Sequence, residues 1–232
     1  MEKDYHDLVS FWNRSFILND ENKEEILKTE GIKDSWKELS PSDKLNDALK
    51  RFKGKEKILD YGCGNGWASI VMAKDGIKNI DACDVAINSI RLLDFYKELF
   101  DVKDAINSFA IHSNWLGAQK EGTYDGFYSS NVIDVVPLEM AKDIIKDAAR
   151  ITKKGAIVIF SLNYYIDPQI MQNKGCEVKN NQIYIDGVLR LTSLTDDEWK
   201  NEFAKYFNDI ELSYFSWPGE QNESRRLFIM KK

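Results

Sequence analysis

Apolar positions in the first fifty residues recur at a helical spacing. Tyr5, Leu8, Trp12 and Phe16 lie three or four residues apart, which predicts a helix over about residues 4–16. The following segment is polar and charged, which is typical of a loop or a short helix, and Ser40-Pro41-Ser42 predicts the start of another helix. We therefore expect residues 1–52 to form an N-terminal helical cap.

From residue 57 the pattern changes to short apolar runs that alternate with amphipathic segments. Strands are predicted at 57–61, 79–84, 107–112, 124–132 and 156–162, and helices at 66–74, 86–100 and 137–152. We expect Gly155 to end the last of these helices. The run AIVIFSL (156–162) is continuously apolar, as in strands buried within a parallel sheet. The alternation predicts an α/β fold with a doubly wound sheet, whose core spans residues 53–162.

In the last seventy residues the apolar runs no longer alternate regularly with amphipathic segments. QIYIDGVLRL (182–191) contains two short β-like runs around Asp186-Gly187, which predicts a β-hairpin. Thr195 and Glu198 form a capping box, so a helix that carries Trp199, Phe203 and Phe207 is expected there. Residues 209–217 and 225–230 resemble a closing strand pair. We predict a single domain, with an insertion or lid over 163–195 and a C-terminal helix and strand pair over 196–232.

Composition and charge narrow the classes of function. The 232 residues include 32 Lys and Arg against 38 Asp and Glu, and the net charge of −6 argues against unaided binding of nucleic acid. No apolar run approaches the roughly 18 residues that span a bilayer, and the N-terminus lacks the pattern of a secretory signal. Three cysteines without C-x-x-C spacing and two histidines favour neither a disulfide framework nor a metal site. We expect a cytoplasmic protein without a metal or membrane partner.

The glycine-rich segment DYGCGNGW (60–67) joins the first predicted strand of the sheet to a helix, where doubly wound folds bind nucleotides. Trp67 stands where a dinucleotide fingerprint needs Gly or Ala. The carboxylate of Asp60 would repel a pyrophosphate but would accept hydrogen bonds from an ammonium group. Asp84 ends the second strand, 18 residues after Gly66 (84 − 66), where a carboxylate can bind both ribose hydroxyls. These features indicate a ligand with a ribose and a cationic amino-acid tail, and S-adenosylmethionine fits.

The segment KILDYGCGNGWAS resembles motif I of the class I S-adenosylmethionine-dependent methyltransferases, of the small-molecule type with methyltransferase 11 and 25 domains. Asp84 after IDAC is similar to the acidic residue of the family's second strand. YDGFYSSNVIDVVP (124–137) and KKGAIVIFSLN (153–163) resemble its fourth-strand and fifth-strand motifs. The resemblance implies a Rossmann-like seven-stranded sheet with an antiparallel last strand. It also implies S-adenosylmethionine as the methyl donor and S-adenosylhomocysteine as the product.

The resemblance assigns roles in binding the cofactor. Asp60 would bind the methionine amino group, Asp84 the ribose, and Val85 the adenine face. The family often has an aspartate after the third strand, but here Ser113 or Asn114 would contact the adenine amino group instead. The expected cofactor site comprises Asp60, Gly62, Cys63, Gly64, Asp84, Val85, Ser113, Asn114, Trp115 and Asn131.

Methyl transfer is a direct displacement that depends mainly on alignment and exclusion of water, so a general base is not obligatory. The candidates for catalysis are His112 and Asp134. A structural or cofactor-adjacent role is favoured over catalysis for His112, and an acid at a helix N-terminus explains Asp134 equally well. The candidates for an acceptor pocket are Tyr5, Trp12, Arg14, Tyr164, Tyr165, Arg190 and Trp217, against which ordinary packing and solvation stand as alternatives. Ser130-Asn131-Val132-Ile133 replaces the proline-containing motif of many nucleic-acid amino-methyltransferases, so we expect a small-molecule acceptor.

Other functions remain open from the sequence. The chain could be a non-catalytic S-adenosylmethionine-binding protein, an NAD-dependent oxidoreductase or an aminopropyl transferase. Trp67 and Asp60 disfavour the nicotinamide enzyme, and the acids that a polyamine site needs are not recognisable. The oligomeric state, monomer or homodimer, is equally open.

Overall fold

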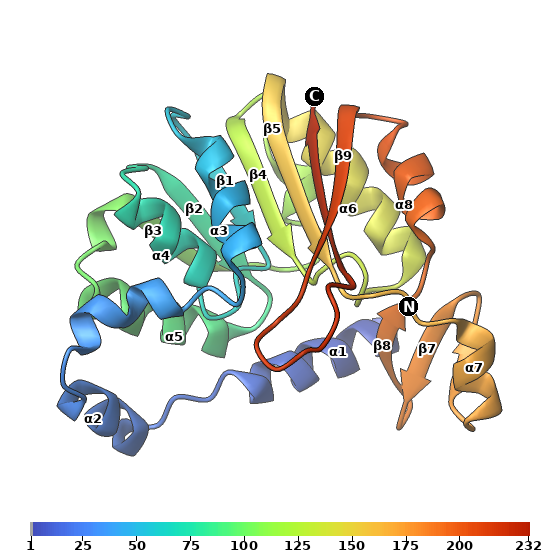
Figure 1. Ribbon diagram of the computed structural model, residues 1–232, viewed down its shortest axis with the longest axis horizontal. Coiled ribbons are helices and arrows are strands. Elements are labelled where there is room, and N and C mark those ends of the chain that lie inside the picture. Colours follow the sequence, from blue (N-terminus) through green and yellow to red (C-terminus); the bar gives the residue numbers. More distant parts are fainter. Residues whose placement is uncertain (1) are drawn as a thin grey trace.

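The computed structural model describes residues 2–232, with side chains from residue 6 onward, so the expected role of Tyr5 lies outside the described side chains. Seven strands form one sheet in the order β3-β2-β1-β4-β5-β10-β9 (Figure 1). The strands are β1 (Ile58–Tyr61), β2 (Ile80–Asp84), β3 (Ile106–Ala110), β4 (Tyr124–Ser130), β5 (Thr152–Leu162), β9 (Asn208–Phe215) and β10 (Arg225–Lys231). The last strand, β10, pairs antiparallel with both β5 and β9. This architecture confirms the predicted doubly wound, Rossmann-like fold.

Helices cover both faces of the sheet. The α-helices are α1 (Glu2–Ser15), α2 (Asp20–Lys28), α3 (Asp43–Leu49), α4 (Trp67–Lys74), α5 (Ile87–Leu99), α6 (Leu138–Ile151), α7 (Pro168–Asn173) and α8 (Asp196–Phe203). Short 3-10 helices span Ile32–Glu38 (η1), Lys50–Phe52 (η2), Lys103–Ala105 (η3) and Leu116–Ala118 (η4). Residues of α3, α4 and α5 form one buried cluster, and residues of α6 and α8 form another on the opposite face. Removal of these apolar side chains from water is the main stabilising contribution to the fold.

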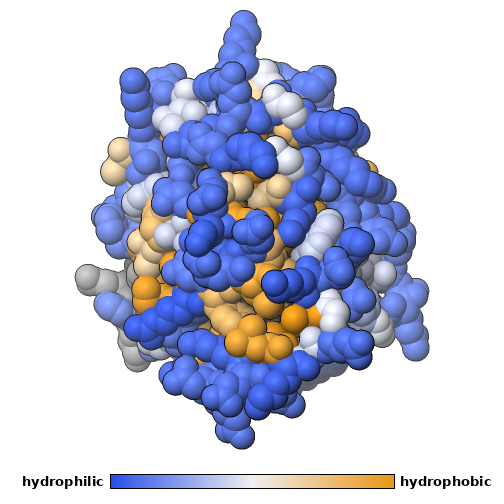
Figure 2. All heavy atoms as spheres, turned by 90° about the vertical axis from the view of Figure 1, so that its left-hand side faces the viewer, coloured by the Kyte–Doolittle hydropathy of each residue, from blue (hydrophilic) through white to orange (hydrophobic). Residues whose placement is uncertain are grey.

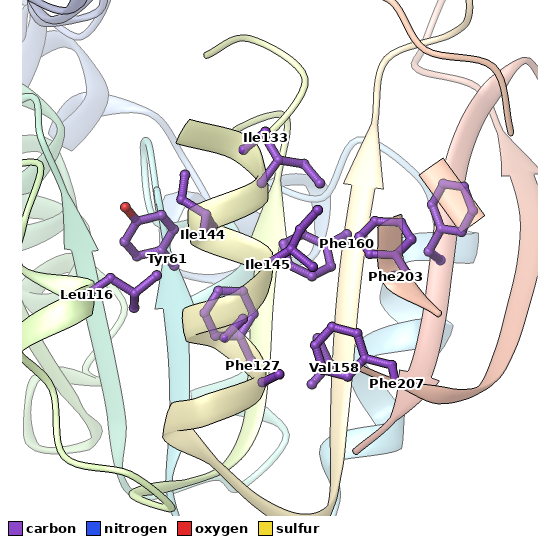
Figure 3. Close-up of a cluster of buried hydrophobic side chains, with 14 of the residues drawn as sticks. Tyr61, Leu116, Phe127, Ile133, Ile144, Ile145, Val158, Phe160, Phe203 and Phe207 are labelled. Carbon is purple, nitrogen blue, oxygen red and sulfur yellow. The ribbon is translucent and has the colours of Figure 1, made fainter. Parts of the chain in front are cut away.

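Aromatic rings link the sheet to the helices on the α6 and α8 face (Figure 3). The rings of Phe127 and Phe160, from neighbouring strands, have centroids 5.4 Å apart, and Phe203 of α8 stacks on Phe160 at 5.2 Å. The capping box predicted at Thr195 and Glu198 is present and starts α8 at the next residue. It directs Trp199 and Phe203 into this core, where both are fully buried.

Two sequence-based expectations on this face need correction. Gly155 does not end the helix before β5: α6 ends at Ile151, where the Thr152 hydroxyl donates to the Ala148 carbonyl at 2.7 Å. Gly155 lies within β5 at φ +78°, where its N–H donates to the Lys232 carbonyl at 2.8 Å. Phe207 lies outside α8, which ends at Phe203, although it is buried in the same cluster.

The insertion after β5 is larger than the predicted hairpin. It contains α7 and a separate three-stranded antiparallel sheet of β6 (Glu177–Lys179), β7 (Gln182–Ile185) and β8 (Val188–Thr192). The β7–β8 turn is at Asp186-Gly187, as predicted, and both residues have positive φ. Thr192 fastens the small sheet to the segment after β4, because its N–H donates to the Asp134 carbonyl at 2.7 Å and its hydroxyl to Val136 at 2.6 Å.

Helix α1 runs along the edge where the parallel strands end, from the small sheet toward α2 (Figure 1). The Asn13 side chain accepts from the Asn88 N–H at 3.0 Å, and the Asn88 side chain donates to the Asn13 carbonyl at 2.9 Å, so α1 is fixed to the start of α5. The predicted N-terminal cap therefore lies across the edge of the sheet that carries the candidate site. Among the described residues, no helix has the length and apolar character needed to cross a membrane.

Candidate cofactor and acceptor site

One cavity of about 680 Å³ lies at this edge of the sheet. Its walls come from the glycine loop after β1, the ends of β2, β4 and β5, helix α1 and the small sheet. Such a volume is within the range of about 300–1,000 Å³ that small-molecule sites occupy. Three sets of predicted residues therefore meet in one space: the cofactor loop, the N-terminal helix and the insertion.

The glycine loop requires its glycines for two reasons. Gly62, Gly64 and Gly66 have φ of +73°, +53° and +77°, a region that side chains with a Cβ rarely adopt. A Cβ at Gly62 would also lie 2.2 Å from Val132 Cγ2, and one at Gly66 would lie 2.2 Å from Leu93 Cδ1. The loop backbone is thus held closely between the end of β4 and helix α5.

Gly64 differs from its two neighbours. A Cβ there would be 3.4 Å from the Phe16 ring, and Gly64 lines the cavity. Gly64 is therefore where the loop backbone borders the cavity, beside the Phe16 ring. Cys63 is buried between these glycines and lines the cavity as well, and burial raises the pKa of its thiol.

Asp84, the last residue of β2, holds the glycine loop through hydrogen bonds. Its carboxylate accepts the N–H of Gly64 at 2.9 Å and the N–H of Ala86 at 2.8 Å. Burial raises the pKa of Asp84, and these backbone donors oppose the rise. Asp84 lines the cavity together with Val85, so oxygen lone pairs that the two N–H groups leave unused are available to hydroxyl donors of a ligand. The arrangement fits the 1,2-diol of a ribose.

Asp60 is a buried acid at the floor of the cavity. It is 2% exposed, and its carboxylate accepts the Ser69 hydroxyl of α4 at 2.6 Å. Burial raises the pKa of Asp60 to about 7, with Asp84 adding to the rise and the Ser69 hydrogen bond opposing it. Among the described residues, no Lys or Arg forms an ion pair with Asp60. A cationic ligand group beside Asp60 would offset the free-energy cost of ionising this buried carboxyl, as the ammonium of S-adenosylmethionine would.

The segment after β3 contributes less than the sequence predicted. Ser113 lines the cavity, whereas His112, Asn114 and Trp115 do not. Trp115 packs on Phe109, with ring centroids 5.2 Å apart, and the His112 side chain is exposed. Ile111, which was not among the predicted residues, lines the cavity. Its N–H donates to the Asp84 carbonyl at 2.9 Å, which holds this segment next to the end of β2. The Ile111 side chain would lie against the face of a ring of the bound ligand.

Asn131 ends β4 in a strained conformation. Its φ is +53°, which asparagine tolerates better than most residues, and its N–H donates to the Ser161 carbonyl at 2.8 Å. Asn131 lines the cavity, and its buried side-chain oxygen has no hydrogen-bond partner among the described residues. An unpartnered acceptor in the same lining as Gly62 and Asp60 suits a ligand that carries an N–H donor.

The wall opposite the glycine loop is apolar. Phe11 and Trp12 of α1 and Phe16, which follows the helix, form part of this wall, and the Trp12 and Phe16 ring centroids are 6.4 Å apart in a stacked arrangement. The small sheet adds Leu189 and Arg190, whose guanidinium lies 3.8 Å from the centroid of the Phe11 ring. Of the predicted arginines, Arg190 is part of the wall, whereas Arg14 is exposed on α1 and does not line the cavity.

A hydrogen-bonded chain closes the cavity at the end of β5. Asp134 is fully buried outside the lining, and its carboxylate accepts both the N–H of Asn163, at 2.6 Å, and its side-chain amide, at 2.9 Å. Burial raises the pKa of Asp134, and the Asn163 donors and nearby Arg226 oppose the rise. The Asn163 side-chain oxygen accepts from Arg225 at 2.6 Å. Asp134 thus orients Asn163, which does line the cavity.

The remaining predicted acceptor residues divide between two places. Tyr164 and Trp217 line the cavity, whereas Tyr165 lines a smaller surface hollow with Tyr214 and Asp196. Lining residues that were not predicted include Phe11, Phe16, Trp67, Tyr128 and Asn163. Phe16 belongs to the predicted stripe with Trp12, and Phe11 lies three residues after Leu8 of that stripe. Helical spacing therefore groups these residues but does not indicate that they line a cavity.

The surface beside the cofactor end of the cavity is partly apolar. Figure 2 shows apolar side chains gathered in the lower half of the face that carries α2 and α5, with polar side chains around them. Ile17 and Ile87 are 63% and 42% exposed, and they follow closely after Phe16 and Val85 of the lining.

Among the described residues, no group of three or more His, Cys, Asp or Glu side chains could hold a metal ion.

Comparisons with known proteins agree with this geometry. The model of a family described as a methyltransferase domain matches residues 34–206. A ubiquinone biosynthesis O-methyltransferase of Cronobacter sakazakii is 26% identical over 178 residues, which are 69% of this chain and 69% of that protein. A ribosomal protein L11 methyltransferase of Nitratiruptor is 31% identical over 119 residues, half of this chain. The chain spans only 38% of the length of that relative.

A solved structure shares the fold at low identity. The PH0226 protein from Pyrococcus horikoshii superposes with a TM-score of 0.64 at 15% identity, over 81% of this chain and 87% of the other. The family match covers the glycine loop, Asp84 and the ends of β3, β4 and β5, the same segments that build the cavity. The chain therefore belongs to the methyltransferase domain family, whose members use S-adenosylmethionine as the methyl donor.

Proposed function

We propose that this protein transfers a methyl group from S-adenosylmethionine to a small molecule with an apolar body. The observation that carries the proposal is the continuity of the cavity. Asp60, Gly64 and Asp84 line the same space as Phe11 of α1 and Leu189 of the small sheet. A donor on the glycine loop and an acceptor against the apolar wall would therefore share one enclosure.

The residues present suit a reaction that depends on alignment. When bound, S-adenosylmethionine supplies an electrophilic methyl group on a sulfonium. Asp60 would hold its ammonium, Asp84 its ribose and Ile111 its base, while Phe11 and Trp12 keep water from the acceptor. Direct displacement proceeds without a protein nucleophile. Neither His112 nor Asp134 lines the cavity, so the proposal requires neither to contact the acceptor.

The curated relatives point to two kinds of acceptor. One is named for O-methylation in ubiquinone biosynthesis, and another for methylation of a ribosomal protein. The apolar wall of α1 and the small sheet favours the small molecule, because a protein side chain must enter with its backbone and needs an open groove. The alignment over only 38% of the L11 methyltransferase also leaves most of that protein without a counterpart here.

Turnover with a fractionated extract tests the proposal. Purified protein is incubated with S-adenosylmethionine carrying a labelled methyl group, together with either the fraction of an extract below about 3 kDa or the protein fraction. We expect micromolar binding of S-adenosylhomocysteine by calorimetry and transfer of label into the small-molecule fraction. Label found only in protein would contradict the small-molecule acceptor. Tight binding of S-adenosylhomocysteine without transfer to either fraction would favour a non-catalytic binding protein.

A further inference from the structure

Two arginines line the cavity, and their surroundings differ. Arg225 begins β10 and is 7% exposed. Its Nε and Nη2 donate to the Glu220 carboxylate at 2.7–3.0 Å, and its Nη1 donates to the Asn163 side chain at 2.6 Å. The guanidinium also lies 3.5 Å from the Trp217 ring centroid. Its charge is compensated and each of its nitrogens has a partner, so Arg225 is a structural part of the wall.

Arg190 is half-buried in β8 and lacks such partners. Its guanidinium lies over the Phe11 ring at 3.8 Å, and no carboxylate or hydrogen-bond acceptor among the described residues pairs with it. Stacking occupies one face of the guanidinium but leaves its N–H groups free, because they point outward in the plane of the group. Those donors match the two oxygens of a carboxylate.

The position of Arg190 is distinct from that of the cofactor acids. Phe16 lies beside Gly64, and Phe11 precedes it by five residues, which is about 7–8 Å along a helix axis. Asp60 contacts Ser69 of α4 on one face of the sheet. The small sheet that carries Arg190 is fastened to Asp134 and Val136, beside α6 on the other face.

This separation bears on which ligand Arg190 would meet. In an amino acid the carboxylate and the ammonium are attached to the same carbon, so a cofactor whose ammonium is bound by Asp60 keeps its carboxylate near Asp60. Arg190 instead has the apolar residues Leu189, Leu191 and Ile183 of the small sheet around it in the lining. A cation on an apolar wall selects an apolar molecule that carries one anionic group.

We propose that Arg190 binds a carboxylate of the methyl acceptor. The substrate is then an apolar, preferably aromatic, carboxylic acid whose carboxylate pairs with the Arg190 guanidinium beside the Phe11 ring. This inference rests on the proposed function and names the class of its substrate. Replacement of Arg190 should remove selection for the anion while leaving the binding of the cofactor product intact.

Matched probe pairs test the assignment on the full chain saturated with S-adenosylhomocysteine. The probes are 1-naphthoate with 1-naphthamide, and cinnamate with cinnamamide, which differ within each pair only at the carboxylate. Their dissociation constants are measured by calorimetry or ligand-observed NMR for the wild type and for Arg190→Leu, Arg190→Gln and Arg190→Lys. Arg51→Leu is the control, since Arg51 pairs with Glu211 and lies outside the cavity lining.

We expect at least one carboxylate to bind the wild type and Arg51→Leu about tenfold or more tightly than its amide. This preference should vanish in Arg190→Leu and Arg190→Gln and persist in part in Arg190→Lys, with less than a twofold change in affinity for S-adenosylhomocysteine. Equal binding of acid and amide to the wild type, or no binding of either acid, would overturn the proposal.

A second arm separates the two possible sources of the carboxylate. 5′-Deoxy-5′-methylthioadenosine lacks the amino-acid part of S-adenosylhomocysteine. If Arg190→Leu weakened S-adenosylhomocysteine tenfold but left methylthioadenosine unchanged, Arg190 would hold the carboxylate of the cofactor, and the acceptor assignment would fail. Failure of the wild type to bind S-adenosylhomocysteine would instead overturn the proposed function itself.

Discussion

The two ends of the cavity are built in opposite ways. The glycine-loop end comes from two short stretches, 60–67 and 84–86, that continue directly from neighbouring parallel strands. The apolar end joins Phe11 of α1 to Leu189 and Arg190 of the small sheet, which lie far apart in the sequence. Local backbone geometry thus determines the first end, and long-range packing determines the second.

The two ends also differ in charge. Asp60 and Asp84 are buried acids with raised pKa at the loop end, whereas Arg190 is a half-buried cation on an apolar wall. Substitutions at the glycine-loop end should therefore alter the binding of the cofactor, and substitutions at the apolar end the binding of the acceptor. Substitutions at each end test this division.

The largest effect is expected from Asp84→Ala. The substitution removes the acceptor of two backbone hydrogen bonds, to Gly64 and Ala86, together with the proposed ribose contact. Hydrogen bonds to a charged group contribute about 1.5–3 kcal/mol each, so affinity for S-adenosylhomocysteine should fall roughly 100-fold or more in calorimetry. Asp143→Ala, on the exposed surface of α6, is the control and should bind normally. A loss below threefold would contradict the role of Asp84.

Gly62→Ala should rank second. The new Cβ would lie 2.2 Å from Val132 Cγ2 at a φ of +73°, so both steric overlap and backbone strain oppose it. We expect destabilisation of about 2–4 kcal/mol in denaturant unfolding and weaker binding of S-adenosylhomocysteine. Gly122→Ala is the matched control, because its φ is +62° with open space around the Cβ, and it should cost only about 1–2 kcal/mol. Equal losses in the two variants would show that the contact with Val132 is unimportant.

Asp60→Asn should act with opposite signs on stability and binding. In the folded protein the pKa of Asp60 rises from 3.8 to about 7, so folding favours its protonated form. Between these pH values the folded state holds the extra proton, and the contribution of Asp60 to stability falls as pH rises toward 7. A pKa shift of this size corresponds to roughly 4 kcal/mol of folding stability lost when the buried carboxyl ionises. Because the amide of Asp60→Asn stays neutral, we expect the variant to be about 1–3 kcal/mol more stable than the wild type at pH 8.

Binding should follow the charge of Asp60. Only the ionised carboxylate attracts the cofactor ammonium, so wild-type affinity for S-adenosylhomocysteine should rise about tenfold per pH unit between pH 5.5 and 7. In Asp60→Asn the affinity should be about tenfold lower at pH 8 and nearly independent of pH over that range. Calorimetry across pH measures both, and an unchanged pH dependence in the variant would show that another group, such as Asp84, is responsible.

The smallest effect is expected from His112→Ala. The side chain is exposed and does not line the cavity, so turnover and its pH dependence should remain within a factor of two of the wild type. A loss of turnover above tenfold, with S-adenosylhomocysteine binding retained, would restore His112 as a general base.

The sequence was informative where a motif reports on local backbone. Asp60, Gly62, Gly64 and Asp84 were found because a strand, a turn and a helix follow one another directly in the chain, and all four line the cavity. The same alternation of apolar runs located the five parallel strands along the chain, whereas the antiparallel last strand was implied by the family resemblance. Gly155 was misread because a glycine after a helix resembles a C-cap, whereas here Thr152 performs that role and the glycine lies within the strand.

The far wall was less predictable for a physical reason. Which side of α1 faces the cavity depends on its docking to Asn88 and on the small sheet, neither of which leaves a local signal. Trp12 and Arg190 were predicted, but their neighbour Phe11 was not, and Arg14 points to solvent. Likewise, Asn163 becomes a lining residue only through Asp134 and Arg225, which are 29 and 62 positions away.

A crystal structure of the protein with S-adenosylhomocysteine would test the division of the cavity most directly. We expect the ribose hydroxyls within hydrogen-bond distance of Asp84, the ammonium at Asp60, and the space beside Phe11 and Arg190 left free for an acceptor. A ligand whose carboxylate reaches Arg190, or whose ribose lies away from Asp84, would contradict this division of the cavity.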